Sequence, residues 1–173
     1  MGTASLPDKR ATQAVFEAHY PFLRLVARQY VRCAGDVDDV VQEGLVRFWK
    51  YARDYAVDTK AYLATCVKNA ALDFLRARQK RREQEHVAQA SESGWETSPL
   101  FEWSLELEES RAALEEALTQ LPVEQREVVV LRIWGELTFP QIGELMGVSH
   151  DTAASRYRYA LPALRKRLTS LPI

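Results

Sequence analysis

The chain has 173 residues, of which 47% are hydrophobic and 27% are charged, enough apolar material for one modest core or two small ones. Its formal net charge of −1 conceals charges that are segregated along the sequence. The two cysteines, Cys33 and Cys66, cannot supply a disulfide framework or a thiolate metal site, and no apolar run is long enough for a signal peptide or a membrane span, so we expect a soluble, cytoplasmic protein.

Apolar residues at helical spacing predict three helices in the first half of the chain. The first is expected from Thr12 to Arg32, with Gly35 ending it. The second is expected to begin at the acidic cluster around Asp36, where negative charge favours a helix N-terminus, and to end near Asp54. The third is expected from Lys60 to Glu83. The absence of period-two alternation predicts that the fold is all-α.

The third predicted helix has an apolar side and a largely basic side. The segment from Lys60 to Arg82 contains seven bases against one acid. Tyr51, Tyr55 and Tyr62 lie nearby, and aromatic rings stack on unpaired bases while lysine and arginine hold the backbone. The pattern is therefore typical of a surface for single-stranded or opening DNA, although a charged helix face can also be merely solvated.

A linker is predicted from residue 85 to residue 106, where helical periodicity stops. The wider segment from Glu83 to Glu116 contains ten glutamates against one base, and Ser, Gly and Pro interrupt its middle. Such a composition is typical of a flexible acidic tether. We therefore expect two small helical domains, at residues 12–84 and 107–170. Within the second, one helix should precede Leu121, and another should start at Pro122 and be closed by Gly135.

The C-terminal part contains the signature of a helix-turn-helix. Thr138 and Gln141 are spaced as a capping box, Gly147 ends a short helix, and Ser149 can cap the next one. Gly143 is small where the two helices should cross. The second helix of this motif presents its first residues to base edges, here His150, Asp151, Thr152, Ser155 and Arg156, unless it is simply a basic surface helix.

The acidic cluster that contains Asp36, Asp38 and Asp39 permits several interpretations. A calcium loop is excluded, because its sixth position is Val41 and its twelfth is Arg47. A diphosphate-handling magnesium enzyme would need a second acidic cluster, which the sequence lacks. The cluster can be only a helix N-terminus, or its continuation through Gln42, Glu43 and Arg47 can form a docking face for a basic partner. Because no phosphate loop or nucleophile motif is found, an enzyme is not expected.

Four motifs in this order resemble the extracytoplasmic-function sigma factors, the small two-domain members of the sigma-70 family. The run from Asp36 through Gln42 and Glu43 to Trp49 resembles the helix by which they dock on RNA polymerase. The segment from Ala61 to Arg76 resembles their helix for the minus-ten element. Leu121-Pro122 with the apolar run at 128–131 resembles the start of their C-terminal domain, and Gly147 to Arg156 is similar to their reader of the minus-thirty-five element.

The resemblance implies three sets of contact residues, no cofactor and no catalytic residues. The clamp helices of the polymerase's largest subunit would contact Asp36, Asp38, Asp39, Gln42, Glu43, Arg47 and Trp49. Minus-ten DNA would contact Tyr55, Lys60, Tyr62, Lys68, Asn69, Asp73, Arg76 and Lys80, with a flipped base held by the loop from Asp54 to Thr59. Minus-thirty-five DNA would contact Ser149, His150, Asp151, Thr152, Ala154, Ser155, Arg156 and Arg158.

Further partners implied by the resemblance are the flap of the second polymerase subunit and an anti-sigma factor. The acidic linker would run towards the RNA exit path. Three residues depart from the family pattern: Tyr62 replaces a usual tryptophan, Ala154 replaces a common lysine, and Pro162 falls inside the last helix. The main alternative is a stand-alone helix-turn-helix regulator that binds operators as a dimer, and the remote one is the magnesium enzyme.

Overall fold

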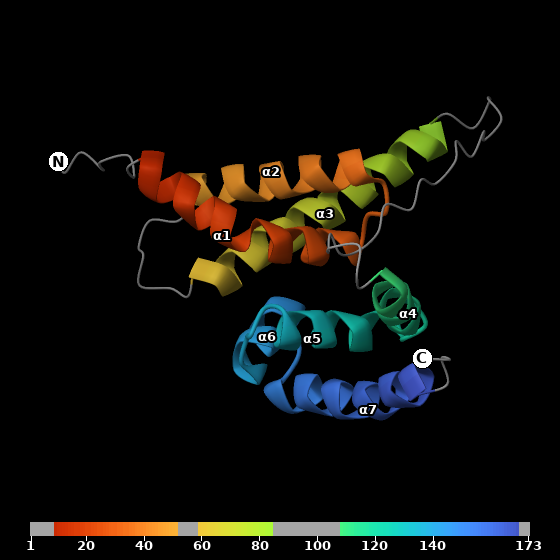
Figure 1. Ribbon diagram of the computed structural model, residues 1–173. Helices are drawn as coiled ribbons and strands as arrows, with labels where there is room; N and C mark the ends of the chain where they lie inside the picture. The colour runs from red at the N-terminus through yellow and green to blue at the C-terminus, as the bar shows by residue number, and fades with distance from the viewer. Residues whose placement is uncertain (1–8, 52–58, 85–107, 170–173) are drawn as a thin grey trace.

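The computed structural model describes residues 9–51, 59–84 and 108–169, which form seven helices and two groups (Figure 1). The N-terminal group consists of α1 (Lys9–Arg28), α2 (Ala34–Tyr51) and α3 (Thr59–Gln84). The C-terminal group consists of α4 (Glu108–Thr119), α5 (Val123–Ile133), α6 (Phe139–Met146) and α7 (His150–Thr169). The all-α prediction is confirmed for these residues. Among them, no helix is long and apolar enough to cross a bilayer.

The three helices of the N-terminal group bury one apolar stripe each against the others. Leu23, Val37, Val41, Leu63 and Val67 are all completely buried. α2 and α3 approach closely at Gly44, where a Cβ atom would lie 2.6 Å from the side chain of Val67. A larger residue there would push the two helices apart, so Gly44 fixes their spacing.

The end of the first helix differs from the prediction. α1 ends at Arg28 rather than Arg32, because Gln29 and Tyr30 donate their backbone N–H groups to carbonyls only three residues back, which tightens the chain into a turn. Gly35 does not close α1 and instead lies in the first turn of α2. A glycine that ends a helix adopts a left-handed backbone, and among the described glycines only Gly147 does so. The predicted end of the second helix near Asp54 lies outside the described residues.

The helix-turn-helix prediction is confirmed in its local geometry. α6 begins with a capping box in which the side chain of Gln141 accepts the backbone N–H of Thr138 at 2.7 Å, and it ends at Gly147 with a φ of 67°. A Cβ atom on Gly143 would lie 2.7 Å from the carbonyl oxygen of Val148, so the turn into α7 passes directly over it. α7 then continues through Pro162 to Thr169.

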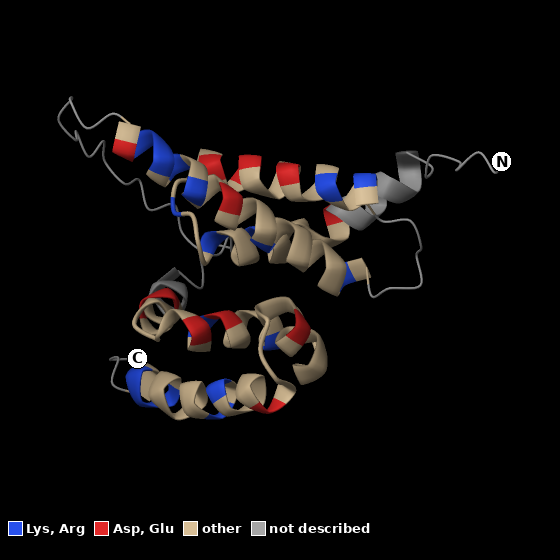
Figure 2. Ribbon diagram, turned by 180° about the vertical axis from the view of Figure 1, so that it is seen from behind, with Lys and Arg blue, Asp and Glu red and all other residues tan. Residues whose placement is uncertain are grey.

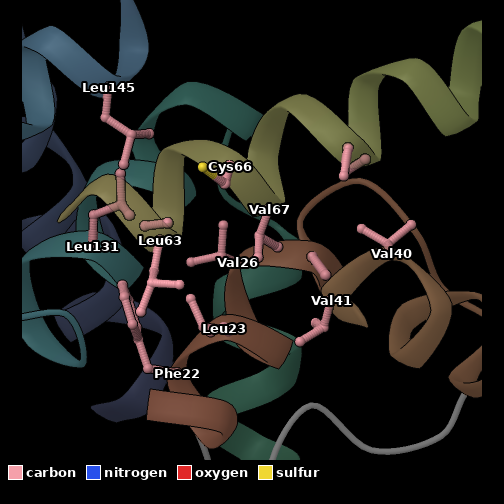
Figure 3. Close-up of a cluster of buried hydrophobic side chains, with 14 of the residues drawn as sticks. Phe22, Leu23, Val26, Val40, Val41, Leu63, Cys66, Val67, Leu131 and Leu145 are labelled. Atoms are coloured by element: carbon pink, nitrogen blue, oxygen red, sulfur yellow. The ribbon is translucent and has the colours of Figure 1, made fainter. Parts of the chain in front are cut away.

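The two groups pack directly against each other. Phe22 and Leu63 from the N-terminal group share one hydrophobic cluster with Leu131 and Leu145 from the C-terminal group. Figure 3 shows Leu131 and Leu145 beside Leu63, with Phe22 below them. A Cβ atom on Gly135 would lie 2.8 Å from the ring of Phe22, so the turn after α5 lies against that ring. The described parts of the two groups therefore form a closed arrangement, in which α5 and α6 lie against α1 and α3.

Candidate nucleic-acid and protein-binding surfaces

The outer face of α2 carries an exposed polar stripe. Its inner face is occupied by residues such as Val37, Val41 and Phe48, which are buried. Helical spacing then turns Asp39, Gln42 and Glu43 outward, and all three are exposed. Figure 2 shows acidic segments along this helix. An acidic stripe on a helix supported from behind by a rigid core suits a basic protein partner.

The other residues predicted for docking have roles within the chain. Asp38 accepts a hydrogen bond from the hydroxyl of Tyr20 at 2.9 Å and lies 3.2 Å from the guanidinium of Arg24, so it ties α2 to α1. Asp36 lies 3.9 Å from the guanidinium of Arg78 on α3. Trp49 is half-buried and stacks edge-on against Phe48 with ring centroids 5.1 Å apart. Asp36 and Asp38 thus join α2 to its neighbouring helices, Trp49 packs against the core, and the exposed polar stripe consists of Asp39, Gln42 and Glu43.

A second exposed stripe runs along α3. Asn69, Asp73, Arg76 and Lys80 lie on one side of this helix, and all four are exposed. Blue segments gather towards the C-terminal end of α3 in Figure 2, where Arg81 and Arg82 continue the positive charge. Ala77 is exposed because α3 extends there beyond the buried residues of its first half. The C-terminal part of α3 is thus a basic helical segment exposed to solvent.

Arg47 connects these two stripes. Its guanidinium donates to Glu43 on its own helix at 2.9 Å and to Asp73 on α3 at 2.6 Å. The second oxygen of Asp73 accepts a bond from Arg76 at 2.9 Å. The hydrogen bond from Arg47 is the main cause of a lowered pKa of the Asp73 carboxyl. The predicted protein-binding and DNA-binding faces therefore share one row of four alternating charges.

The remaining predicted contacts on α3 face inward or towards the C-terminal group. Tyr62 is half-buried and packs on Phe48, with ring centroids 5.6 Å apart, and burial raises the pKa of its phenol. Lys60 lies 5.3 Å from the ring centroid of Phe22 and 3.9 Å from the carboxylate of Glu136. Lys68 donates to the carbonyl oxygen of Leu145 at 3.3 Å. Tyr55 and the predicted base-binding loop lie outside the described residues.

The start of α7 is built as a capped, exposed helix N-terminus. The hydroxyl of Ser149 accepts the backbone N–H of Thr152 at 3.1 Å, which satisfies one of the open donors of the first turn. Ser149, His150, Asp151 and Thr152 are all exposed, and the imidazole of His150 lies 3.2 Å from the carboxylate of Asp151. Helix N-termini with exposed N–H groups and hydroxyls suit phosphate oxygens.

Further along α7, some of the predicted DNA contacts are exposed and others are half-buried. Arg158 is exposed, and its guanidinium lies 5.5 Å from the centroid of the Tyr159 ring. Ala154, Ser155 and Arg156 are half-buried. The charge of Arg156 lowers the pKa of both Lys68 and Glu127. The structure brings the predicted residues of α7 together, and those that are exposed are Ser149, His150, Asp151, Thr152 and Arg158.

Comparison with known proteins identifies the family of this chain. Residues 15–81 match the family described as sigma-70 region 2, and residues 111–164 match the family described as sigma-70 region 4. The sigma factor SigK of Mycobacterium ulcerans is 30% identical over 148 residues, which cover 83% of this chain and 78% of SigK. This chain is an extracytoplasmic-function sigma factor of the sigma-70 family. As such, it is a non-enzymatic subunit that directs RNA polymerase to promoters.

Other relatives of the sigma factor cover nearly its whole length. SigL of Mycobacterium tuberculosis is 29% identical over 174 residues, which cover 98% of this chain and 96% of SigL. Among solved structures, RpoE of Bartonella quintana in complex with the anti-sigma factor NepR has a TM-score of 0.69 at 21% identity, covering 94% of this chain and 99% of that one. CnrH in complex with the cytosolic domain of CnrY has a TM-score of 0.64 at 23% identity, covering 96% and 92%. These two likenesses show that the fold is shared.

Sequence reasoning missed a set of polar residues that join the two groups of this sigma factor. Glu127 on α5 is buried and lies 3.7 Å from the ammonium of Lys68. Arg126 donates to the side chain of Gln29 at 2.8 Å, and Gln29 in turn donates to the carbonyl oxygen of Leu25. One signal was available, because Glu127 lies four residues before Leu131 and hence on the apolar side of α5. Nothing in the sequence indicated what that side would contact.

Proposed function

We propose that this sigma factor docks on the clamp helices of the largest polymerase subunit through Asp39, Gln42 and Glu43, and contacts minus-ten DNA through the outer face of α3. The observation that carries the proposal is the row from Glu43 through Arg47 and Asp73 to Arg76, because it places an acidic and a basic face side by side on one rigid pair of helices. A basic protein and a polyanion could therefore be bound at the same time.

The second promoter contact proposed is between α7 and minus-thirty-five DNA. Helix N-termini of helix-turn-helix motifs enter the major groove, and here the exposed first turn is rigidly held by Ser149 and by the close passage over Gly143. Arg156 and Arg158 would supply the guanidinium groups, which bond guanine through two donors. With the domains divided as residues 12–84 and 107–170, each promoter element would be read by its own domain.

The proposal also includes contacts of the C-terminal domain and of the linker, and an anti-sigma factor as a further partner. The C-terminal domain would contact the flap of the second polymerase subunit, and the acidic segment at residues 85–106 would run towards the RNA exit path. The similar structure of RpoE was solved with the anti-sigma factor NepR bound, which supports an anti-sigma factor for this chain as well. The place of action would be the bacterial cytoplasm, where the polymerase is.

A transcription experiment tests this proposal against the rival of a stand-alone regulator. The purified chain is assayed with and without core polymerase for transcripts from its promoter, and alone for binding to the same DNA duplex. We expect specific transcripts only with the polymerase and little specific binding by the chain alone. Tight, specific binding of a dimer without polymerase would favour the regulator instead.

Charge reversal tests the docking face separately. The double variant Asp39→Lys with Glu43→Lys should lose binding to core polymerase while it retains its helical content, because both residues are exposed and outside the core. The matched control is Glu124→Lys, which reverses an exposed acid at the start of α5. Undiminished polymerase binding by the double variant would show that the docking face lies elsewhere.

A further inference from the structure

An apolar groove lies on the C-terminal group, where the end of α5 and the start of α6 meet the middle of α7. The groove has a volume of about 840 Å³. Its apolar lining consists of Phe139 from α6 and of Ala154, Tyr157, Leu161 and Pro162 from α7. In Figure 1, α7 lies on the side of the C-terminal group that is turned away from α1, α2 and α3. Leu161 and Pro162 are accordingly exposed.

The groove presents apolar surface that the described residues leave uncovered. The rings of Phe139 and Tyr157 lie with their centroids 5.7 Å apart, and both residues are half-buried. Leu161 is 40% exposed. Pro162 has no backbone N–H and adds an apolar ring to the lining. Apolar groups that gather in a concave place, with a few polar groups around them, are typical of binding sites.

Three arginines complete the lining of the groove: Arg132, Arg158 and Arg165. Arg132 donates to the carbonyl oxygen of Leu137 at 2.8 Å, and its guanidinium lies 5.1 Å from the centroid of the Phe139 ring. No acidic residue lines the groove, and among the described residues no carboxylate forms an ion pair with any of the three arginines. The groove therefore combines apolar surface with positive charge that the described part of the chain does not neutralise.

Two of the departures from the family pattern lie in this groove. Ala154 replaces a lysine that is common at its position, and Pro162 falls inside the last helix. Both residues are apolar and therefore increase the apolar share of the lining. A small apolar residue in place of a cation weakens a site for phosphates and suits an apolar partner.

The kind of partner follows from this combination of charge and apolar surface. DNA phosphates would neutralise the arginines but would make no use of the apolar lining. A helix that carries apolar residues at positions i, i+4 and i+7, with glutamates or aspartates beside them, would place its apolar side in the groove and pair its carboxylates with the guanidinium groups. Charge complementarity therefore favours an acidic amphipathic helix of a protein.

We propose that this groove is a docking site for an acidic amphipathic helix of a partner protein, with Leu161 as an apolar contact and Arg165 as a pairing guanidinium. This inference goes beyond the proposed function and does not depend on it. Neither Leu161 nor Arg165 belongs to the residues proposed to contact polymerase or DNA, so the two can be changed without touching those sets.

Peptide binding to the full chain tests the positive charge of the groove. The probe is a fluorescein-labelled helical peptide with a leucine stripe flanked by glutamates, and its affinity is measured by fluorescence anisotropy. The chain should bind the peptide saturably, and Arg165→Glu should weaken binding on the order of tenfold, because a carboxylate would then face the glutamates. The control Lys166→Glu makes the same charge change at the next residue, which is exposed and outside the groove, and should bind as the original chain does.

A second pair of variants tests the apolar lining. Leu161→Ser should weaken binding of the peptide several-fold, whereas Val123→Ser changes an exposed valine of α5 outside the groove and should leave the affinity unchanged. A peptide whose leucines are replaced by serines should not bind, although its charge is the same. Circular dichroism checks that each variant retains its helical content.

Several results would overturn the inference. One is the absence of saturable peptide binding by the original chain, and another is an equal affinity in either variant and its control. If a DNA duplex of mixed sequence displaced the peptide, and Leu161→Ser weakened binding of that duplex as well, the groove would be part of the DNA surface instead. If the chain formed a dimer that Leu161→Ser dissociated in sedimentation experiments, the occupant would be a second copy of the chain.

Discussion

Arg47 on α2 and Asp73 on α3 are joined by a hydrogen bond of 2.6 Å between guanidinium and carboxylate. Glu43 and Arg76 extend this pair at either end, so the row crosses from the acidic stripe to the basic one. A polymerase that engages Glu43 would compete for one of the two acids that hold Arg47. Binding of a partner to Glu43 on α2 would therefore affect the positions of Asp73 and Arg76 on α3.

The first prediction concerns the energy of this pair. Because both side chains are partly exposed, Asp73→Asn and Arg47→Ala should each change the free energy of unfolding by no more than about 1 kcal/mol. A double-mutant cycle should give a coupling of roughly 0.5 kcal/mol, measured by denaturant unfolding. A coupling of zero would mean that the row has no energetic role in the isolated chain.

The second prediction compares two glycines. Gly143→Ala should destabilise the C-terminal group by about 1–3 kcal/mol, because the new Cβ atom would lie 2.7 Å from the carbonyl oxygen of Val148. Gly35→Ala is the matched control, since its Cβ atom would meet nothing within 4 Å and alanine favours a helix by up to about 1 kcal/mol. Thermal unfolding should show opposite shifts, and equal shifts would contradict the close passage over Gly143.

Sequence patterns predicted those features of the fold that depend only on residues close together in the chain. The capping box at Thr138, the left-handed Gly147 and the Ser149 cap each depend on residues within one turn, and all three predictions are confirmed. The interpretation of Gly35 as a helix stop was wrong, because composition does not reveal the sign of φ. The acid that pairs with Lys68 is separated from it by 58 intervening residues and is set by how the two groups pack, and no periodicity in the chain encodes that.

The third prediction follows from the burial of Glu127, which raises the pKa of its carboxyl from the ordinary value of 4.5 to about 7, against the opposing charge of Arg156. The closed arrangement therefore binds this proton more tightly than an open one, in which the carboxyl lies in water. As the pH rises from 4.5 to about 7, the carboxyl of open chains loses its proton first, so the preference for the closed arrangement should fall over this window and change no further above it.

Spin labels on the exposed native Cys33 and on a new cysteine in Glu144→Cys, with Cys66→Ala removing the buried thiol, report the distance between the two groups from about pH 5 to pH 8. Glu127→Gln should remove this pH dependence, because its side-chain amide does not titrate. A pH dependence as large in Glu127→Gln as in the original chain would assign the titration to another group.

The last prediction separates two arginines of α7 by their kind of DNA contact. Arg156→Ala should weaken promoter binding of the assembled polymerase by roughly 1–3 kcal/mol and relax the preference for one base of the minus-thirty-five element, because a bidentate guanidinium distinguishes guanine from other bases. Arg158→Ala is the control. If the exposed Arg158 meets a phosphate, its loss should weaken all promoter sequences alike and reduce the salt dependence of binding. The measurement is affinity for a set of promoters changed at single minus-thirty-five positions. If Arg156→Ala weakened binding to all promoters equally, Arg156 would contact a phosphate instead of a base. If the affinity did not change, Arg156 would not contact DNA.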